Sequence, residues 1–307
     1  MSFTADNAAY TLRTHVLALL DIGSFGCDVV YAGNATYHQS HPQIYIFPNL
    51  RDILMNHNLE KRFWEIDFLR GLAIIMMILF HILYDLTYFG ECNLNLHSGF
   101  WLYFGRTTAT IFILLVGISL TLSFSRAKKI QNAGQKIYQK YIKRGLKVFS
   151  WGLIITLTTF VFLREGFIVF GILHFIGISI ILAYPFLKLR SGNLLIGTAF
   201  ISIGLYLKNF TFGFPWLMWL GLKPERFYTV DYFPFFPWFG VILIGLFFGK
   251  LLYPDYKRKF NLCDLSDFTF IRLFCFLGRH SLLIYLIHQP ILIALLYLLG
   301  IVNIGLL

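Results

Sequence analysis

Seven apolar runs, each close to the length of a bilayer's hydrocarbon core, most constrain what this chain can fold into. A transmembrane helix needs about 20 predominantly apolar residues. Only 13% of the 307 residues are charged, whereas a soluble domain carries about 25%. The sequence therefore predicts an all-α, polytopic membrane helix bundle. Its seven expected transmembrane helices cover roughly residues 67–88, 100–124, 146–164, 167–187, 193–208, 233–252 and 281–300.

The cationic side chains gather in three of the loops that join these runs. Loops 125–147, 188–192 and 250–280 carry eight, two and six Lys or Arg residues, and the opposite loops carry few. These three loops fall on one side of the bilayer if all seven runs are helices, and loops rich in Lys and Arg face the cytosol. We therefore predict a cytosolic N-terminus and a multi-pass protein of the cell membrane.

The first 54 residues differ from the rest of the chain. Their formal charge is −2, whereas the whole chain carries +11 and the remainder therefore +13. In a membrane protein this excess indicates loop orientation and attraction for anionic lipid or a phosphorylated ligand, so we expect no nucleic-acid partner. We interpret residues 1–54 as an N-terminal extension, or as the product of a start assigned too early with Met55 as the initiator. Residues 60–307 then form the functional transmembrane domain.

A polar stripe runs along the first apolar helix. Asp67, Arg70, Met77, His81 and Asp85 are separated by three, seven, four and four residues. At about 3.6 residues per turn, all five fall close to one face of the helix. Ionisable groups inside a bilayer are costly and usually functional. The stripe is therefore the first place to look for chemistry.

His81 and Asp85 stand one turn apart, at the spacing of an i,i+4 pair. A carboxylate there can accept the N–H of the imidazole ring and raise the basicity of the other ring nitrogen. That arrangement suits a general base. The structural alternative is a histidine that bonds a neighbouring helix, with Asp85 reaching to the membrane interface. We favour the functional interpretation because the pair is intramembrane.

The other buried polar groups have both structural and functional interpretations. Asp67 and Arg70 form either a salt bridge at a helix start or a site for a phosphate or carboxylate that enters from the cytosol. His174 and His288 are packing partners or donors to a reacting oxygen. Arg106 is either an interface residue or such a donor.

Four ordered motifs resemble the heparan-α-glucosaminide N-acetyltransferase catalytic domain family, one of the transmembrane acyltransferases. The resemblance runs from about residue 60 to the C-terminus, and the chain is similar in size to the compact microbial members. The motifs are Asp67-Phe-Leu-Arg70-Gly71 with His81 and Tyr84-Asp85; Gly105-Arg106 with Phe112 and Gly117-Ile-Ser119; Phe236-Pro-Trp-Phe-Gly240 with Gly245 and Gly249; and Leu277-Gly-Arg-His-Ser-Leu282 with Tyr285 and His288-Gln-Pro290.

The resemblance implies transfer of an acetyl group from cytosolic acetyl-CoA to an acceptor on the other side of the membrane. Its lysosomal members acetylate the amine of a terminal glucosamine. On this basis we expect a sugar or cell-envelope glycan hydroxyl or amine as acceptor. Arg70 and Asp67 would hold acetyl-CoA, and His81 with Asp85 would deprotonate the acceptor for direct transfer. A route through acetyl-His81 ranks second.

Arg106, His174 and His288 are the remaining candidates, either for binding the substrate or for stabilising the oxyanion. We expect no metal, because the four cysteines have no metal-binding spacing. A homo-oligomer is compatible with the sequence.

Two rival functions stay open at this stage. The first is a proton-coupled membrane transporter in which His81 and Asp85 relay protons. The halves of the chain show no internal repeat, which argues against it. The second is a non-enzymatic relative that has kept the fold, but the presence of His81, Asp85, Arg70 and Arg106 argues against lost activity.

Overall fold

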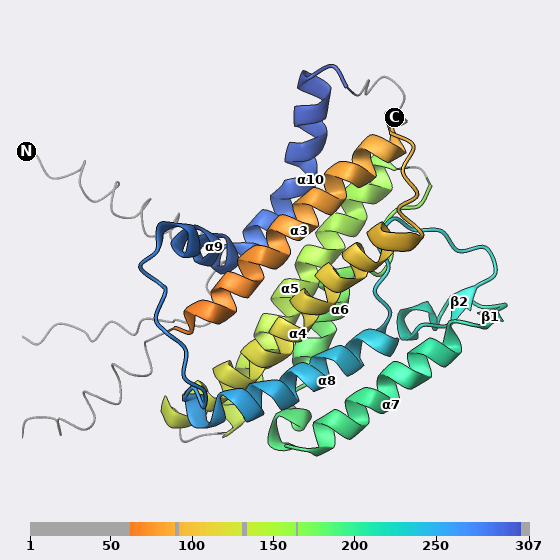
Figure 1. Cartoon of the computed structure of the whole chain (residues 1–307). Coiled ribbons are helices and arrows are strands. Elements are labelled where there is room, and N and C mark those ends of the chain that lie inside the picture. The colour runs from red at the N-terminus through yellow and green to blue at the C-terminus, as the bar shows by residue number, and fades with distance from the viewer. Residues whose placement is uncertain (1–61, 90–91, 131–133, 164, 302–307) are drawn as a thin grey trace, which may run out of the picture.

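The structure is a computed structural model that describes residues 62–89, 92–130, 134–163 and 165–301. The prediction for residues 1–54 lies outside this part of the chain. Eight α-helices lie in the described residues and form a membrane helix bundle, which confirms the predicted fold class (Figure 1). They are α3 (Trp64–Tyr88), α4 (Gly99–Ile130), α5 (Gly134–Phe162), α6 (Ile172–Leu182), α7 (Gly192–Leu207), α8 (Phe235–Leu252), α9 (Thr269–Arg279) and α10 (Ser281–Leu298).

Five helices (α3, α4, α5, α8 and α10) are long and apolar enough to cross a bilayer. Each of the seven predicted spans contains a helix, but two of these helices are shorter than the usual transmembrane length of about 17–25 residues, and only α6 is much shorter than predicted. The run 193–208 forms α7, which has 16 residues. The run 167–187 forms α6, which has only 11 residues and covers about 16 Å at 1.5 Å per residue. That is roughly half of a hydrocarbon core.

α6 is short because other contacts hold the chain on both sides of it. Before α6, the backbone pairs with the loop that precedes α8: Val230 N–H donates to the Gly166 carbonyl at 2.9 Å, and Phe233 N–H to that of Phe170 at 3.1 Å. After α6, Pro185 begins a short 3₁₀-helix, η2 (Pro185–Lys188). Both interruptions fall inside an apolar run, so hydropathy does not reveal them.

The remaining ordered segments lie in the loops. The strands β1 (Thr211–Phe212) and β2 (Lys223–Pro224) pair in parallel between α7 and α8, with the 3₁₀-helix η3 (Met218–Leu220) between them. A further 3₁₀-helix, η4 (Pro254–Tyr256), follows α8. No helix was predicted at α9, because its residues fall within 250–280, which the charge pattern indicates as a basic loop.

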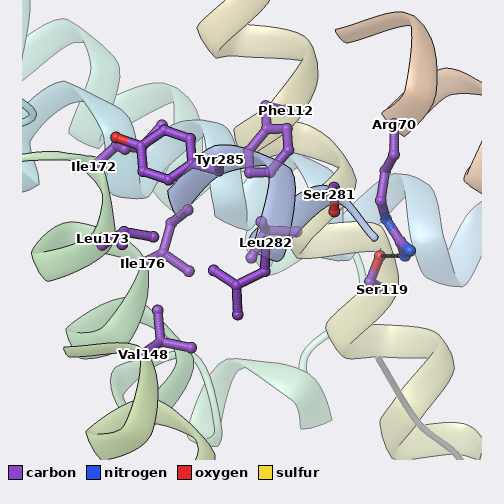
Figure 2. A pocket seen from close by; sticks show the side chains of 11 residues that line it. Arg70, Phe112, Ser119, Val148, Ile172, Leu173, Ile176, Ser281, Leu282 and Tyr285 are labelled. Carbon is purple, nitrogen blue, oxygen red and sulfur yellow. Dashed lines mark hydrogen bonds between the residues drawn. The ribbon is translucent and has the colours of Figure 1, made fainter. Parts of the chain in front are cut away.

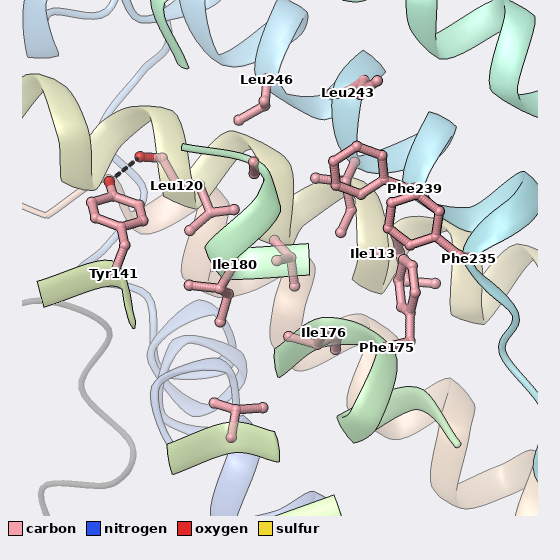
Figure 3. Packing of buried hydrophobic residues seen from close by; sticks show 14 of the residues in the cluster. Ile113, Leu120, Tyr141, Phe175, Ile176, Ile180, Phe235, Phe239, Leu243 and Leu246 are labelled. Atoms are coloured by element: carbon pink, nitrogen blue, oxygen red, sulfur yellow. Dashed lines mark hydrogen bonds between the residues drawn. The ribbon is translucent and has the colours of Figure 1, made fainter. Parts of the chain in front are cut away.

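A core of aliphatic and aromatic side chains joins α4, α5, α6 and α8 (Figure 3). Phe235 and Phe239 of α8 stack with their ring centroids 4.5 Å apart. The Tyr141 hydroxyl of α5 donates to the Leu120 carbonyl of α4 at 3.1 Å. This bond satisfies a phenol that is almost fully buried. The core fixes α4, one of the helices against which α3 packs.

The predicted cytosolic loops meet at one end of the bundle. Lys250 Nζ donates to the Leu189 carbonyl at 2.8 Å, which joins the loop after α6 to the end of α8. Arg258 makes two hydrogen bonds to the Glu65 carboxylate, of 2.8 and 2.6 Å, and so ties the loop after α8 to the start of α3. The Tyr253 hydroxyl donates to the same carboxylate at 2.9 Å. This clustering agrees with the predicted loop arrangement, while the side that faces the cytosol stays a prediction.

α3 and α9 approach each other closely because two glycines lie at their crossing. A Cβ atom at Gly278 would overlap the Asp67 carbonyl, and one at Gly71 would overlap the Phe274 carbonyl. Small residues at such crossings let backbones come together in membrane bundles. Larger side chains at either position would push α9 away from α3.

We therefore predict that Gly278→Val destabilises the fold. Overpacking a tight contact costs about 1–3 kcal/mol, and more where backbone must move. Thermal unfolding in detergent, followed by size-exclusion chromatography, measures the effect. Gly213→Val is the matched control, because a Cβ atom there has nothing within 4 Å. Equal unfolding temperatures for the two variants would contradict the α3–α9 contact.

Candidate active site

The polar stripe of α3 faces protein along its whole length. α9 covers its first half, α10 covers its second half, and α4 runs alongside both halves of the helix (Figure 1). Glu65 and Asp67 occupy the first turn of α3, where the helix dipole favours negative charge. The stripe thus follows from the helical spacing, and its partners come from segments far away in sequence.

Arg70 is held at the inner end by α3 and α4. Its guanidinium donates to Asp67 Oδ1 at 3.0 Å and to Ser119 Oγ at 2.6 Å. The Ser119 hydroxyl donates its own hydrogen to the Leu115 carbonyl, so its lone pair is available to Arg70. The Asp67–Arg70 salt bridge, one of the two interpretations of this pair, is present, and a role in ligand binding stays a prediction. Ser119 belongs to one of the family motifs but was not predicted as a site residue.

A pocket lies beside Arg70 and extends between α4, α5, α6 and α10 (Figure 2). Its walls are mostly apolar, with Arg70, Ser119 and Ser281 grouped at one side and Tyr285 at the other. The lining residues are Arg70, Phe112, Val116, Ser119, Val148, Ile172, Leu173, Ile176, Ser281, Leu282 and Tyr285.

Arg144 on α5 adds a second cation to this region. It lies close enough to Arg70 to interact with it electrostatically. The sequence predicted that Arg144 lies in the basic loop 125–147, whereas the structure places it in α5. The inner end of the bundle thus offers two arginines from different helices, one of which lines an apolar pocket. Such an arrangement suits a ligand with an anionic head and a thin apolar arm.

The outer end of the stripe meets α10. The rings of His81 and His288 have centroids 4.8 Å apart. Gln289 Nε2 donates to Asp85 Oδ1 at 2.6 Å. Asp85 is only 3% exposed and His288 only 8%. Two pairs of side chains therefore bridge α3 and α10, one helical turn apart on α3.

The expected hydrogen bond between His81 and Asp85 does not form in the described residues. The bond that Asp85 makes goes to Gln289, and the ring of His81 packs against that of His288. The i,i+4 spacing brings His81 and Asp85 to one face, but α10 crosses there and supplies a better-placed amide. Gln289 was not predicted as a site residue.

His174 has hydrogen bonds at both ring nitrogens. Gly171 N–H donates to Nδ1 at 3.3 Å, so the proton of the neutral ring lies on Nε2, 3.3 Å from Thr156 Oγ1. The Thr156 hydroxyl then donates to the Ile168 carbonyl at 2.7 Å. These bonds join the start of α6 to α5. His174 is the third residue of α6 and does not line the pocket.

Arg106 is exposed on α4 and does not line the pocket either. It interacts electrostatically with Lys223 in the outer loops. Of the three predicted oxyanion or substrate candidates, only His288 lies beside His81.

Asp231 lies near the outer end of the pocket and was missed in the sequence. Its Oδ2 accepts the N–H of Ile172 at 3.1 Å, and its carboxyl interacts electrostatically with Tyr285. Both partners line the pocket. Burial raises the pKa of the Asp231 carboxyl to about 6, and the Ile172 N–H offsets part of this rise. No motif or spacing in the outer loop indicated this position.

The fold and site together define a membrane helix bundle with an arginine-lined pocket and a pair of histidines, His81 and His288, packed between α3 and α10. A comparison with protein families matches residues 62–290 to the family described as heparan-alpha-glucosaminide N-acetyltransferase, catalytic. The chain belongs to this family, which confirms the resemblance seen in its motifs. No curated protein and no solved structure gives a significant match. The family is one of membrane acetyltransferases, which implies an acetyl-CoA-type co-substrate.

We predict a pH-dependent contribution of Asp231 to stability. Because its pKa is about 6 in the folded chain and about 3.9 when unfolded, the folded state binds the proton more tightly. Stability should therefore fall as pH rises from about 4 to 6, by about 3 kcal/mol at most. Asp231→Asn cannot ionise and keeps an oxygen for Ile172, so it should raise the unfolding temperature at pH 7.5 and not at pH 4.

The control for this prediction is Asp267→Asn, because Asp267 is an exposed carboxylate. Unfolding temperatures of all three proteins across the pH range provide the measurement. The same change for Asp231→Asn at both pH values would contradict the raised pKa.

Proposed function

We propose that this protein transfers an acetyl group from cytosolic acetyl-CoA to a hydroxyl or amine of a sugar or cell-envelope glycan. The observation that carries the proposal is that α3 bears both the pocket arginine, Arg70, and the histidine of the outer pair, His81. These residues are eleven positions apart, which is about 16 Å along a helix. One helix thus connects a cationic pocket to a buried site with a basic ring.

The inner end suits the donor. In this proposal Arg70 and Arg144 bind phosphate oxygens, and the apolar walls of the pocket contact the pantetheine arm. Asp67 and Ser119 take part indirectly, because they fix the guanidinium of Arg70. The basic loops at the same end raise the local concentration of the anionic donor.

His81 is the proposed general base. The acceptor oxygen or nitrogen attacks the thioester carbonyl carbon while His81 takes its proton. The carbon–sulfur bond then breaks, and the leaving thiolate receives the proton from His81. Asp85, one turn away, favours the imidazolium by its charge. Direct transfer needs no covalent intermediate, so it ranks above a route through acetyl-His81.

The first test is transfer of labelled acetyl from acetyl-CoA by the purified protein in lipid nanodiscs. We expect binding of CoA and acetylation of a sugar acceptor. His81→Ala should lower the rate by about 10²–10⁴-fold, the usual contribution of a general base, with CoA affinity unchanged. His97→Ala, at an exposed outer-loop position, is the control. Undiminished transfer by His81→Ala would rule out this base.

The second test concerns the donor pocket. Arg70→Gln removes the charge while its amide can still bond Ser119, so we expect at least tenfold weaker CoA binding, because charge-assisted contacts to phosphate are lost. Isothermal titration with CoA measures the affinity. Arg190→Gln, an exposed cation in a basic loop, should change it far less. Equal affinities would place the donor elsewhere.

A further inference from the structure

The bridge between α3 and α10 leaves hydrogen-bond acceptors without donors. Gln289 Nε2 donates to Asp85 Oδ1 at 2.6 Å. The second oxygen of Asp85, Oδ2, and the amide oxygen of Gln289, Oε1, are both buried and have no hydrogen-bond partner in the described part of the chain. A carboxylate oxygen and an amide oxygen can only accept.

His288 adds a third atom of the same kind. Its Nδ1 lies 2.6 Å from the Tyr285 carbonyl. A carbonyl oxygen only accepts, so the ring carries a hydrogen on Nδ1, and Nε2 of the neutral ring bears a lone pair. His288 Nε2 is also buried and has no hydrogen-bond partner within the part of the chain that the structure describes. Asp85, His288 and Gln289 are called the α3–α10 cluster below.

Buried polar atoms in folded proteins are nearly always hydrogen-bonded, so each exception needs an explanation. In the α3–α10 cluster three exceptions occur together, and all three lack the same thing, a donor. His174 provides the contrast, because neighbouring groups satisfy both of its ring nitrogens. The cluster also borders His81, the proposed base, through the contact between the His81 and His288 rings.

We propose that the α3–α10 cluster binds the substrate that receives the acetyl group, through hydroxyl or amine groups that donate hydrogen bonds to Asp85 Oδ2, Gln289 Oε1 and His288 Nε2. This inference rests on the proposed function and makes it more specific. Asp85 becomes a substrate-binding residue, and its charge excludes anions. The cluster therefore selects a neutral or cationic sugar with several adjacent donors over a uronate or a sugar phosphate.

A reciprocal exchange tests this role. In Asp85→Asn, the amide oxygen still accepts from Gln289, so the contact between the helices stays. The amide nitrogen replaces Asp85 Oδ2, so the atom that would face the substrate becomes a donor. In the double variant Asp85→Asn/Gln289→Glu, the new amide donates to the new carboxylate, so position 85 regains a free acceptor and position 289 keeps one. The single variant thus removes the acceptor at position 85 but keeps the bridge between the helices. The double variant restores that acceptor.

The probes are glucosamine, methyl glucoside, glucuronate and glucose 6-phosphate, tested for binding and for acetylation. We expect Asp85→Asn to raise KM for glucosamine or methyl glucoside at least tenfold and to reduce the preference over glucuronate. The double variant should return KM to within about threefold of the wild type. Unfolding temperature and CoA affinity should stay unchanged in both. An unchanged KM in Asp85→Asn, or no recovery in the double variant, overturns the proposal.

Two further readouts separate failure of this inference from failure of the proposed function. If neither CoA binding nor transfer is detected, the proposed function fails. If CoA binds but none of the four sugars does, the cluster is not a sugar site and the inference alone fails. ¹⁵N NMR of the histidine rings tests the bonding directly: His288 should be protonated on Nδ1 and bare on Nε2. The opposite tautomer would remove one of the three acceptors and contradict the assignment.

Discussion

A polar side chain on a membrane helix must be covered by protein, and the arrangement around α3 follows from this constraint. Lipid supplies no partner for Arg70 or Asp85, and each unsatisfied polar group is costly in hydrocarbon. Ser119 of α4 satisfies Arg70, and Gln289 of α10 satisfies one oxygen of Asp85. α9 packs against the inner half of α3 through glycine contacts. The need to cover α3 therefore sets the positions of three helices, α4, α9 and α10.

The inner and outer parts of the stripe differ in how completely they are satisfied. At the inner end, Arg70 has fixed partners on two helices. At the outer end, the α3–α10 cluster retains three buried atoms without donors in the described chain. A cation held by two fixed partners keeps its geometry when a ligand arrives, whereas unsatisfied acceptors gain hydrogen bonds from a ligand. This difference matches a division of labour between a rigid donor pocket and a site that a substrate completes.

Much of the fold could be predicted from the sequence, because bilayer length and charge bias are local signals. The positions of the helices other than α9 and the common end of the basic loops follow from these two signals, and the face shared by Asp67, Arg70, His81 and Asp85 follows from the helical period. What could not be predicted depends on distant partners. α6 begins later than predicted because the segment before it pairs with the loop before α8, and Asp85 bonds a residue 204 positions away. Hydropathy and i,i+4 spacing carry no information about either contact.

The shortness of α6 gives the two ends of the molecule different capacities for change during evolution. The inner side of the pocket is bounded by long helices, where an insertion would shift the register of every later turn. The outer side is bounded partly by the paired loops around Gly166 and Val230, where residues can be added or removed without disturbing a helix. Under the proposed function, relatives of this chain can therefore diversify in the acceptor that they modify while the shape of the donor pocket is retained.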